Sequence, residues 1–159
     1  MRHTFSALLV SLLVGCATRP VPVGYTGPIA TVADGGFIED STKAQLFVLS
    51  EIDGNTIPRS IGPSGGSSYY GRRITFVTRE VPAKPMKVKL LATHITPAPI
   101  QALVSHAAGT FFAVEGVVNF NPQPNGRYVV KGELKKDRSS VWLEDANTNQ
   151  PVTEKIVEK

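Results

Sequence analysis

The sequence has a single cysteine, Cys16, among its 159 residues, so no disulfide can form within one chain. Long apolar runs are also missing: the apolar run at residues 7–14 is far shorter than the ~20 residues of a membrane-spanning helix. Histidine and tryptophan are scarce, with three and one copies. A folded domain in this chain must therefore be stabilised by its apolar core alone.

Groups for catalysis are equally sparse. After the N-terminal stretch, His94 and His106 are the only histidines that could act as a catalytic base. No serine lies in a Gly-x-Ser-x-Gly motif. The glycine-rich segment 62–71 has no Gly-Lys-Ser/Thr for phosphate binding. Adjacent acids Glu144 and Asp145 would point to opposite faces of a strand. We predict a non-enzymatic protein without a cofactor or metal site, in which His94 lies at the edge of the core.

The charge is mildly basic, with 17 Lys and Arg against 13 Asp and Glu. This excess is too small to indicate a nucleic-acid partner. The signs are unevenly distributed, since acids dominate residues 34–53 whereas cations dominate residues 59–89 and 127–138. On one shared face, these cations would suit anionic lipid or an acidic partner; otherwise they form ordinary solvated strand faces.

The N-terminus has the pattern of a secretory leader. Arg2 supplies a positive charge, residues 7–14 are apolar, and the run ends in Leu13-Val14-Gly15-Cys16. We assign residues 1–15 as a signal peptide. An ordinary signal peptide that happens to carry a cysteine, or a buried N-terminal strand, are the alternatives.

Those four residues resemble the lipobox of bacterial lipoprotein precursors. The resemblance implies that Cys16 is acylated, becomes the mature N-terminus and holds the chain on a membrane. It also implies sorting by the next residue, and Ala17 is not the aspartate associated with inner-membrane retention. We therefore expect an outer-membrane lipoprotein that faces the periplasm.

Residues 16–28 follow as a proline-rich tether. Pro20, Pro22 and Pro28 disfavour helix, so the segment is expected to be an extended spacer that reaches ~30 Å.

The remaining residues, 29–159, read as one β-domain. Short apolar or alternating segments are separated by turn signals such as Asp34-Gly35-Gly36 and Asp53-Gly54. One helical turn is expected over Ile100–Ala108, ended by Gly109. The strands are expected at Ile29–Ala33, Ala44–Ile52, Ile57–Ile61, Arg73–Val81, Met86–Thr96, Thr110–Phe120, Arg127–Lys135, Ser140–Glu144 and Val152–Val157.

This pattern predicts an all-β fold, because too little helix is present to cross between parallel strands. An antiparallel β-sandwich, immunoglobulin-like or transthyretin-like, is the first choice and a small open β-barrel the alternative. The tyrosine-rich turn region and Gly126-Arg127-Tyr128-Val129-Val130 resemble carboxypeptidase-regulatory or transthyretin-type modules, which implies a sandwich.

The candidate binding residues are Tyr69, Tyr70, Arg72 and Arg73, because tyrosine and arginine are enriched at interface hot spots. The alternative is that both tyrosines cover the core. Trp142, the only tryptophan, is expected in the core; a sugar-stacking role is the alternative.

Three functions remain open. The first is a non-catalytic, membrane-tethered envelope protein that binds a protein partner or supports an envelope assembly. The second is a periplasmic inhibitor of a hydrolase such as lysozyme. The basic charge of this chain disfavours its association with an enzyme that is also basic. The third is a glycan- or peptidoglycan-binding module that uses Trp142, Tyr69 or Tyr70.

Overall fold

A computed structural model describes residues 19–58, 60–62, 65–70 and 73–158. The predicted signal peptide, the predicted lipidation site Cys16 and the candidate residue Arg72 lie outside these residues. In the described part of the chain, no helix has the length and apolar character needed to span a membrane.

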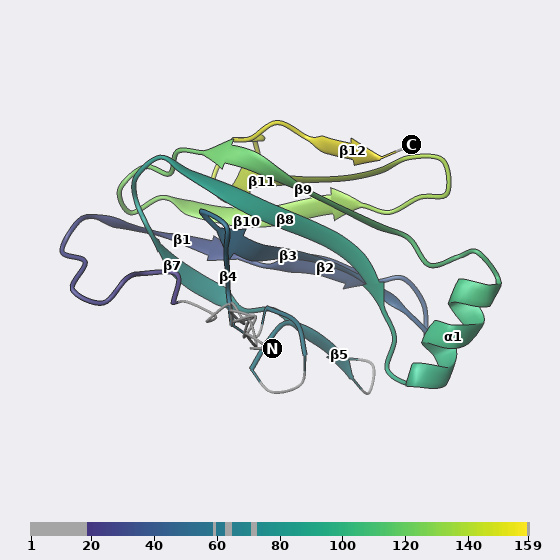
Figure 1. Cartoon of the computed structure of the whole chain (residues 1–159). Coiled ribbons are helices and arrows are strands. Elements are labelled where there is room, and N and C mark those ends of the chain that lie inside the picture. The colour runs from purple at the N-terminus through teal and green to yellow at the C-terminus, as the bar shows by residue number, and fades with distance from the viewer. Residues whose placement is uncertain (1–18, 59, 63–64, 71–72, 159) are drawn as a thin grey trace, which may run out of the picture.

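Two sheets pack face to face and form a β-sandwich, which confirms the predicted fold class (Figure 1). The first sheet has the order β12-β11-β10-β1-β7 and the second β2-β3-β8-β9, with β4 beside β3. Among the described strands of these two sheets, only β1 and β10 pair in parallel. The strands of the two sheets are β1 (Ile29–Ala33), β2 (Gly35–Ile38), β3 (Ala44–Ile52), β4 (Asn55–Thr56), β7 (Thr78–Pro82), β8 (Met86–Ile95), β9 (Ala113–Phe120), β10 (Arg127–Glu133), β11 (Ser139–Asp145) and β12 (Ile156–Glu158).

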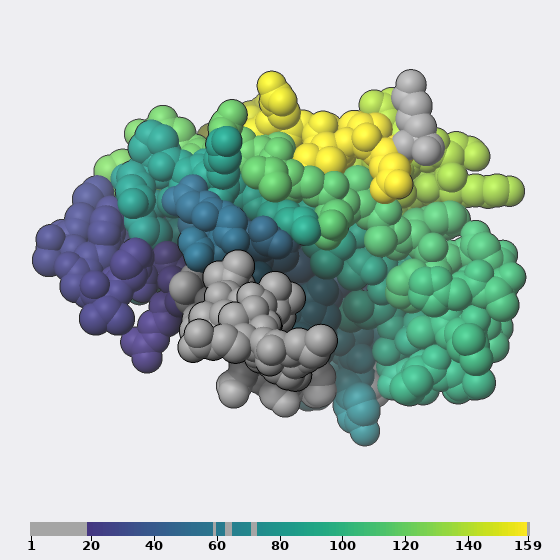
Figure 2. Space-filling model, viewed as in Figure 1, coloured from purple at the N-terminus to yellow at the C-terminus, as the bar shows by residue number. Residues whose placement is uncertain are grey.

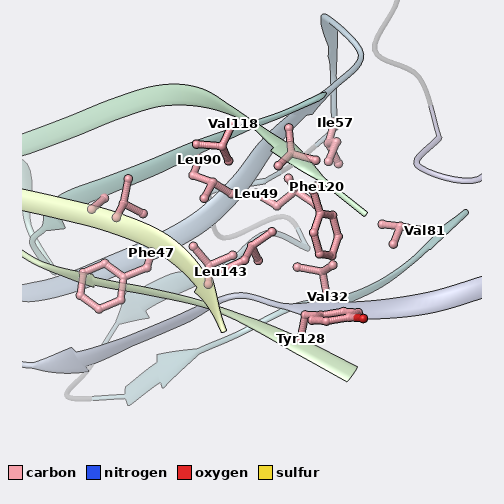
Figure 3. Packing of buried hydrophobic residues seen from close by; sticks show 14 of the residues in the cluster. Val32, Phe47, Leu49, Ile57, Val81, Leu90, Val118, Phe120, Tyr128 and Leu143 are labelled. Carbon is pink, nitrogen blue, oxygen red and sulfur yellow. The ribbon is translucent and has the colours of Figure 1, made fainter. Parts of the chain in front are cut away.

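The core lies between the sheets and follows the alternation of the strands (Figure 3). In β8, alternate residues from Met86 to Ala92 are buried, whereas Lys87 on the other face is exposed. Phe120 and Tyr128 meet edge to face, with ring centroids 4.9 Å apart. Each fully buried Val or Leu contributes about 1.5–3 kcal/mol to the free energy of unfolding, so this core can stabilise the domain without disulfides.

The chain changes sheets at Asp34, between β1 and β2. Here we expected a turn, but the backbone continues as a strand. The glycines instead allow neighbouring backbone to pass close to the chain. A Cβ on Gly35 would lie 2.3 Å from the carbonyl oxygen of Val130. A Cβ on Gly36 would meet the carbonyl oxygen of Gln45 at 2.2 Å.

A buried polar cluster holds this crossing. One carboxylate oxygen of Asp34 accepts the backbone N–H of Leu49 at 3.1 Å. The other accepts the Ser67 hydroxyl at 2.6 Å and pairs with the Arg79 guanidinium at 2.8 Å. Burial raises the pKa of Asp34, and Arg79 opposes that shift. The cluster therefore joins both sheets and the loop that contains Ser67.

Three strand predictions need correction. The return over Ile57–Ile61 is wrong, because β4 ends at Thr56 and the Ile57 side chain enters the core instead. Arg73–Val81 is two strands: β6 (Arg73–Thr75) forms a hairpin with β5 (Ser68–Tyr70), and β7 joins the sandwich. The last strand is shorter than expected, since Pro151 makes only a single bridge with Glu144 before β12.

The sandwich has two distinct ends (Figure 1). The tether end contains residues 19–28, the β3–β4 turn and the β9–β10 loop. Two backbone hydrogen bonds connect the chain here: the Ala83 N–H donates to the carbonyl of Pro28, and the Asn125 N–H donates to the carbonyl of Ile29. The far end contains the β2–β3 turn at residues 39–43, the excursion between β8 and β9 at residues 96–112, and the β10–β11 turn at residues 134–138. The helix α1 (Pro99–Ala107) lies within this excursion.

The described part of the tether is bent rather than extended. Tyr25 N–H donates to the carbonyl of Pro22 at 3.1 Å, and the Tyr25 hydroxyl donates to the carbonyl of Pro28 at 3.0 Å. Its residues Pro20, Pro22 and Val23 line an apolar pocket at the tether end with Ile52, Ile57 and Met86, of about 470 Å³. Residues 19–28 therefore lie against the domain and are less extended than predicted.

Candidate interaction surfaces

The two tyrosines of the predicted binding stretch have different positions. Tyr69 is buried, and its hydroxyl donates to the backbone carbonyl of Asp40 at 3.2 Å. Tyr70 is 77% exposed and lies directly opposite Arg73 in the β5–β6 hairpin, so both side chains share its outer face. Tyr69 therefore covers the core and fixes the hairpin, whereas Tyr70 and Arg73 form an exposed hairpin surface, and their binding role stays a prediction.

Trp142 lies outside the core, contrary to expectation. It occupies the half-buried outer face of β11, because its neighbours Val141 and Leu143 take the inward positions. The indole N–H donates to the Glu144 carboxylate at 3.2 Å, and the Lys155 ammonium lies 4.0 Å from the ring centroid. This cation covers the ring, so the side chain is not an open platform for stacking a sugar. β11 and β5 also lie on opposite sides of the molecule in Figure 1, so Trp142 and Tyr70 do not form one site.

His94 is a bonded core residue, as predicted. The residue is 2% exposed, Nε2 lies 2.8 Å from the Glu39 carboxylate, and Nδ1 accepts the backbone N–H of Phe112 at 2.9 Å. Because Nδ1 is an acceptor, Nε2 carries the proton in the neutral ring. Burial lowers the pKa of His94, although Glu39 opposes that shift. His94 therefore connects the β2–β3 turn with the segment that follows α1.

The helix α1 is present where the sequence predicted it, and Gly109, with φ of 65°, ends it. Its orientation was not foreseen. Ile100, Leu103 and Val104 are 64%, 65% and 61% exposed, whereas Gln101, Ala102 and Ser105 are half-buried on the side toward the domain. A surface helix ordinarily turns its apolar stripe to the core. Here the apolar stripe faces solvent and the small or polar stripe faces the domain.

A cleft of about 240 Å³ lies beside the helix, between the β10–β11 turn and residues 111–113. Lys135, Lys136, Arg138 and Glu158 supply its charged lining. Phe111 connects the cleft with the helix, because its ring also stacks on His106 of α1 with centroids 4.1 Å apart. Figure 2 shows the helix segment in green as a protrusion at one end, beside the yellow-green β10–β11 region. We call the exposed apolar stripe and this cleft together the far-end surface.

The sequence contained part of the signal for this surface. The spacing of Ile100, Leu103 and Val104 predicted the helix, and the cationic run around Lys136 was visible. What it could not show is which way the helix turns, since periodicity fixes only that the apolar residues share a face.

Within the described residues, no three His, Cys, Asp or Glu side chains gather closely enough to hold a metal ion. Comparison of the chain with protein-family models, curated proteins and solved structures finds no match.

Proposed function

We propose that this protein is a non-catalytic outer-membrane lipoprotein whose β-sandwich binds a protein partner on the periplasmic side. One observation carries the proposal: three exposed apolar side chains of α1, Ile100, Leu103 and Val104, lie beside a cation-lined cleft at the end opposite the tether (Figure 1). A domain anchored through Cys16 would have its tether end near the membrane. Its far end would then face other envelope components.

The alternatives receive less support. Lys155 covers the ring of Trp142, which a glycan-binding module would need as a stacking surface. Among candidate catalytic bases, His94 is buried and already bonded on both ring nitrogens. The basic charge remains unfavourable for an inhibitor of a basic hydrolase.

Anchoring is tested by fractionating cells that produce the wild type or Cys16→Ser. We expect the wild type in the outer-membrane fraction and the variant in the soluble periplasmic fraction, because the acyl chains hold the chain on the membrane. Equal distribution of both forms would contradict the lipoprotein assignment.

Partner binding is tested by photo-crosslinking in intact cells from a probe at Tyr70. We expect a discrete protein adduct that becomes weaker with Cys16→Ser, since the anchor concentrates the domain at the membrane. A matched probe at Val117, an exposed apolar residue of β9, is the control. Absence of any protein adduct both from Tyr70 and from the far end would contradict partner binding.

A further inference from the structure

We propose that the far-end surface is a docking site for a protein with an apolar groove flanked by carboxylates, into which α1 inserts. This inference rests on the protein-binding part of the proposed function and identifies the partner's chemistry. The inference is based on one observation: the exposed apolar stripe of α1 lies beside a cleft that is lined by cations.

The helix is suited to insertion. Ile100, Leu103 and Val104 follow the i, i+3, i+4 spacing by which helices bind grooves. Pro99 at the start and Gly109 at the end define the helix before a partner arrives. The helix is therefore preformed, which lowers the entropy cost of binding.

The cleft supplies the polar part of the contact. Lys135 pairs with Glu133, whereas Lys136 and Arg138 have no ion-pair partner among the described residues. The cleft lining has three cations and a single carboxylate, that of Glu158. Carboxylates at the edge of a partner's groove would complement this charge and orient the helix in it.

A protein partner fits better than a membrane. Helices that lie in a bilayer interface carry Lys or Arg on the polar face and Trp, Phe or Leu on the other. The sequence of α1, Pro-Ile-Gln-Ala-Leu-Val-Ser-His-Ala, contains no Lys, Arg or aromatic residue other than His106. The helix also lies at the end opposite the tether, away from the membrane that would hold Cys16.

The test places a photo-crosslinking probe at Leu103 in the full, lipidated chain within living cells and identifies the adduct by mass spectrometry. The matched control is the same probe at Val117, which is 59% exposed on β9. We expect a protein adduct from position 103 and none from position 117. The crosslinked segment should line an apolar groove with Asp or Glu at its edge.

Charge reversal then tests the cleft. Lys136→Glu with Arg138→Glu should lower the adduct yield from position 103 about tenfold, because both steering and rim contacts are lost. Lys84→Glu, an exposed cation at the tether end, should leave it unchanged. The purified variants should have the thermal midpoint of the wild type, which separates loss of binding from loss of folding.

Other outcomes overturn the inference. A phospholipid adduct would show that α1 enters a membrane, and an adduct with the same chain would show self-association. No adduct, or a yield insensitive to charge reversal, would remove this surface as the docking site. If Tyr70 still crosslinks to a protein in that case, the proposed function stands and only the location fails.

Discussion

At the scale of single residues, the buried cluster around Asp34 has the largest consequence for stability. Asp34→Asn would leave the Arg79 guanidinium buried without its counter-charge. We expect a loss of about 3–5 kcal/mol in the free energy of unfolding, as measured by urea titration. Asp137→Asn, at an exposed position, is the matched control and should change it by less than about 0.5 kcal/mol. Equal effects of both would refute this role of the cluster.

His94 makes stability depend on pH. Because burial lowers its pKa in the folded state, the unfolded chain takes up a proton first as the pH falls. The free energy of unfolding should therefore decrease below about pH 6.5, the ordinary value for histidine, until the folded-state pKa is reached. Glu39, Asp40 and Lys43 are the charged residues that act on the His94 ring, and all three are retained in the variants below.

The measurement is urea unfolding at pH 7.5 and pH 5.5. His94→Gln should reduce the difference between the two pH values, whereas His106→Gln, on the exposed helix, should retain it. A difference that is the same in all three proteins would assign the pH dependence to other groups.

Burial could be predicted for residues whose environment follows from strand alternation. It could not be predicted for contacts between residues that are distant in the sequence. His94 continues the buried parity of β8, so its burial was foreseen. Trp142 occupies the opposite parity from Val141 and Leu143, and the size of its side chain wrongly outweighed that pattern. The pairing of Asp34 with Arg79 joins residues 45 positions apart, and nothing local indicates it.

At the scale of elements, α1 should unfold separately from the sandwich, because none of its residues is buried. Gly109→Ala would force an alanine to a φ of 65°, which costs about 1 kcal/mol. Amide hydrogens of the helix should then exchange about fivefold faster, with the global unfolding midpoint unchanged.

Gly54→Ala, at a φ of 77° in the β3–β4 turn, is the matched control. It should leave exchange in α1 unaltered. A fall in the global midpoint with Gly109→Ala would show instead that the helix is part of the cooperative core.

Strand positions were foreseen wherever alternation or apolar runs were strong, as in β1 and β3, whose bounds match the prediction. The segment from Asp34 to Gly36 was misinterpreted because glycine serves both turns and close approach. Only the sheet crossing, where the carbonyl of Val130 leaves no room for a Cβ, distinguishes the two.

At the scale of the whole molecule, anchoring through Cys16 predicts an orientation. β8 has ten residues, so the tether end and the far end are about 33 Å apart. Because the chain has no other cysteine, a label can be placed on Asn55→Cys or Leu103→Cys in the lipidated protein. In vesicles with a headgroup quencher, we expect strong quenching at position 55 and little at position 103. The reverse order would place α1 at the membrane.

The pairing of β1 has a mechanical consequence for a protein held at one end and bound at the other. β1 follows the tether directly and is hydrogen-bonded on both sides, to β10 in parallel and to β7 antiparallel. Tension between the anchor and the far end acts along this strand, so the bonds of both ladders are loaded together in shear rather than opened one after another. The hydrogen bonds of β1 would then determine the force at which the domain unfolds.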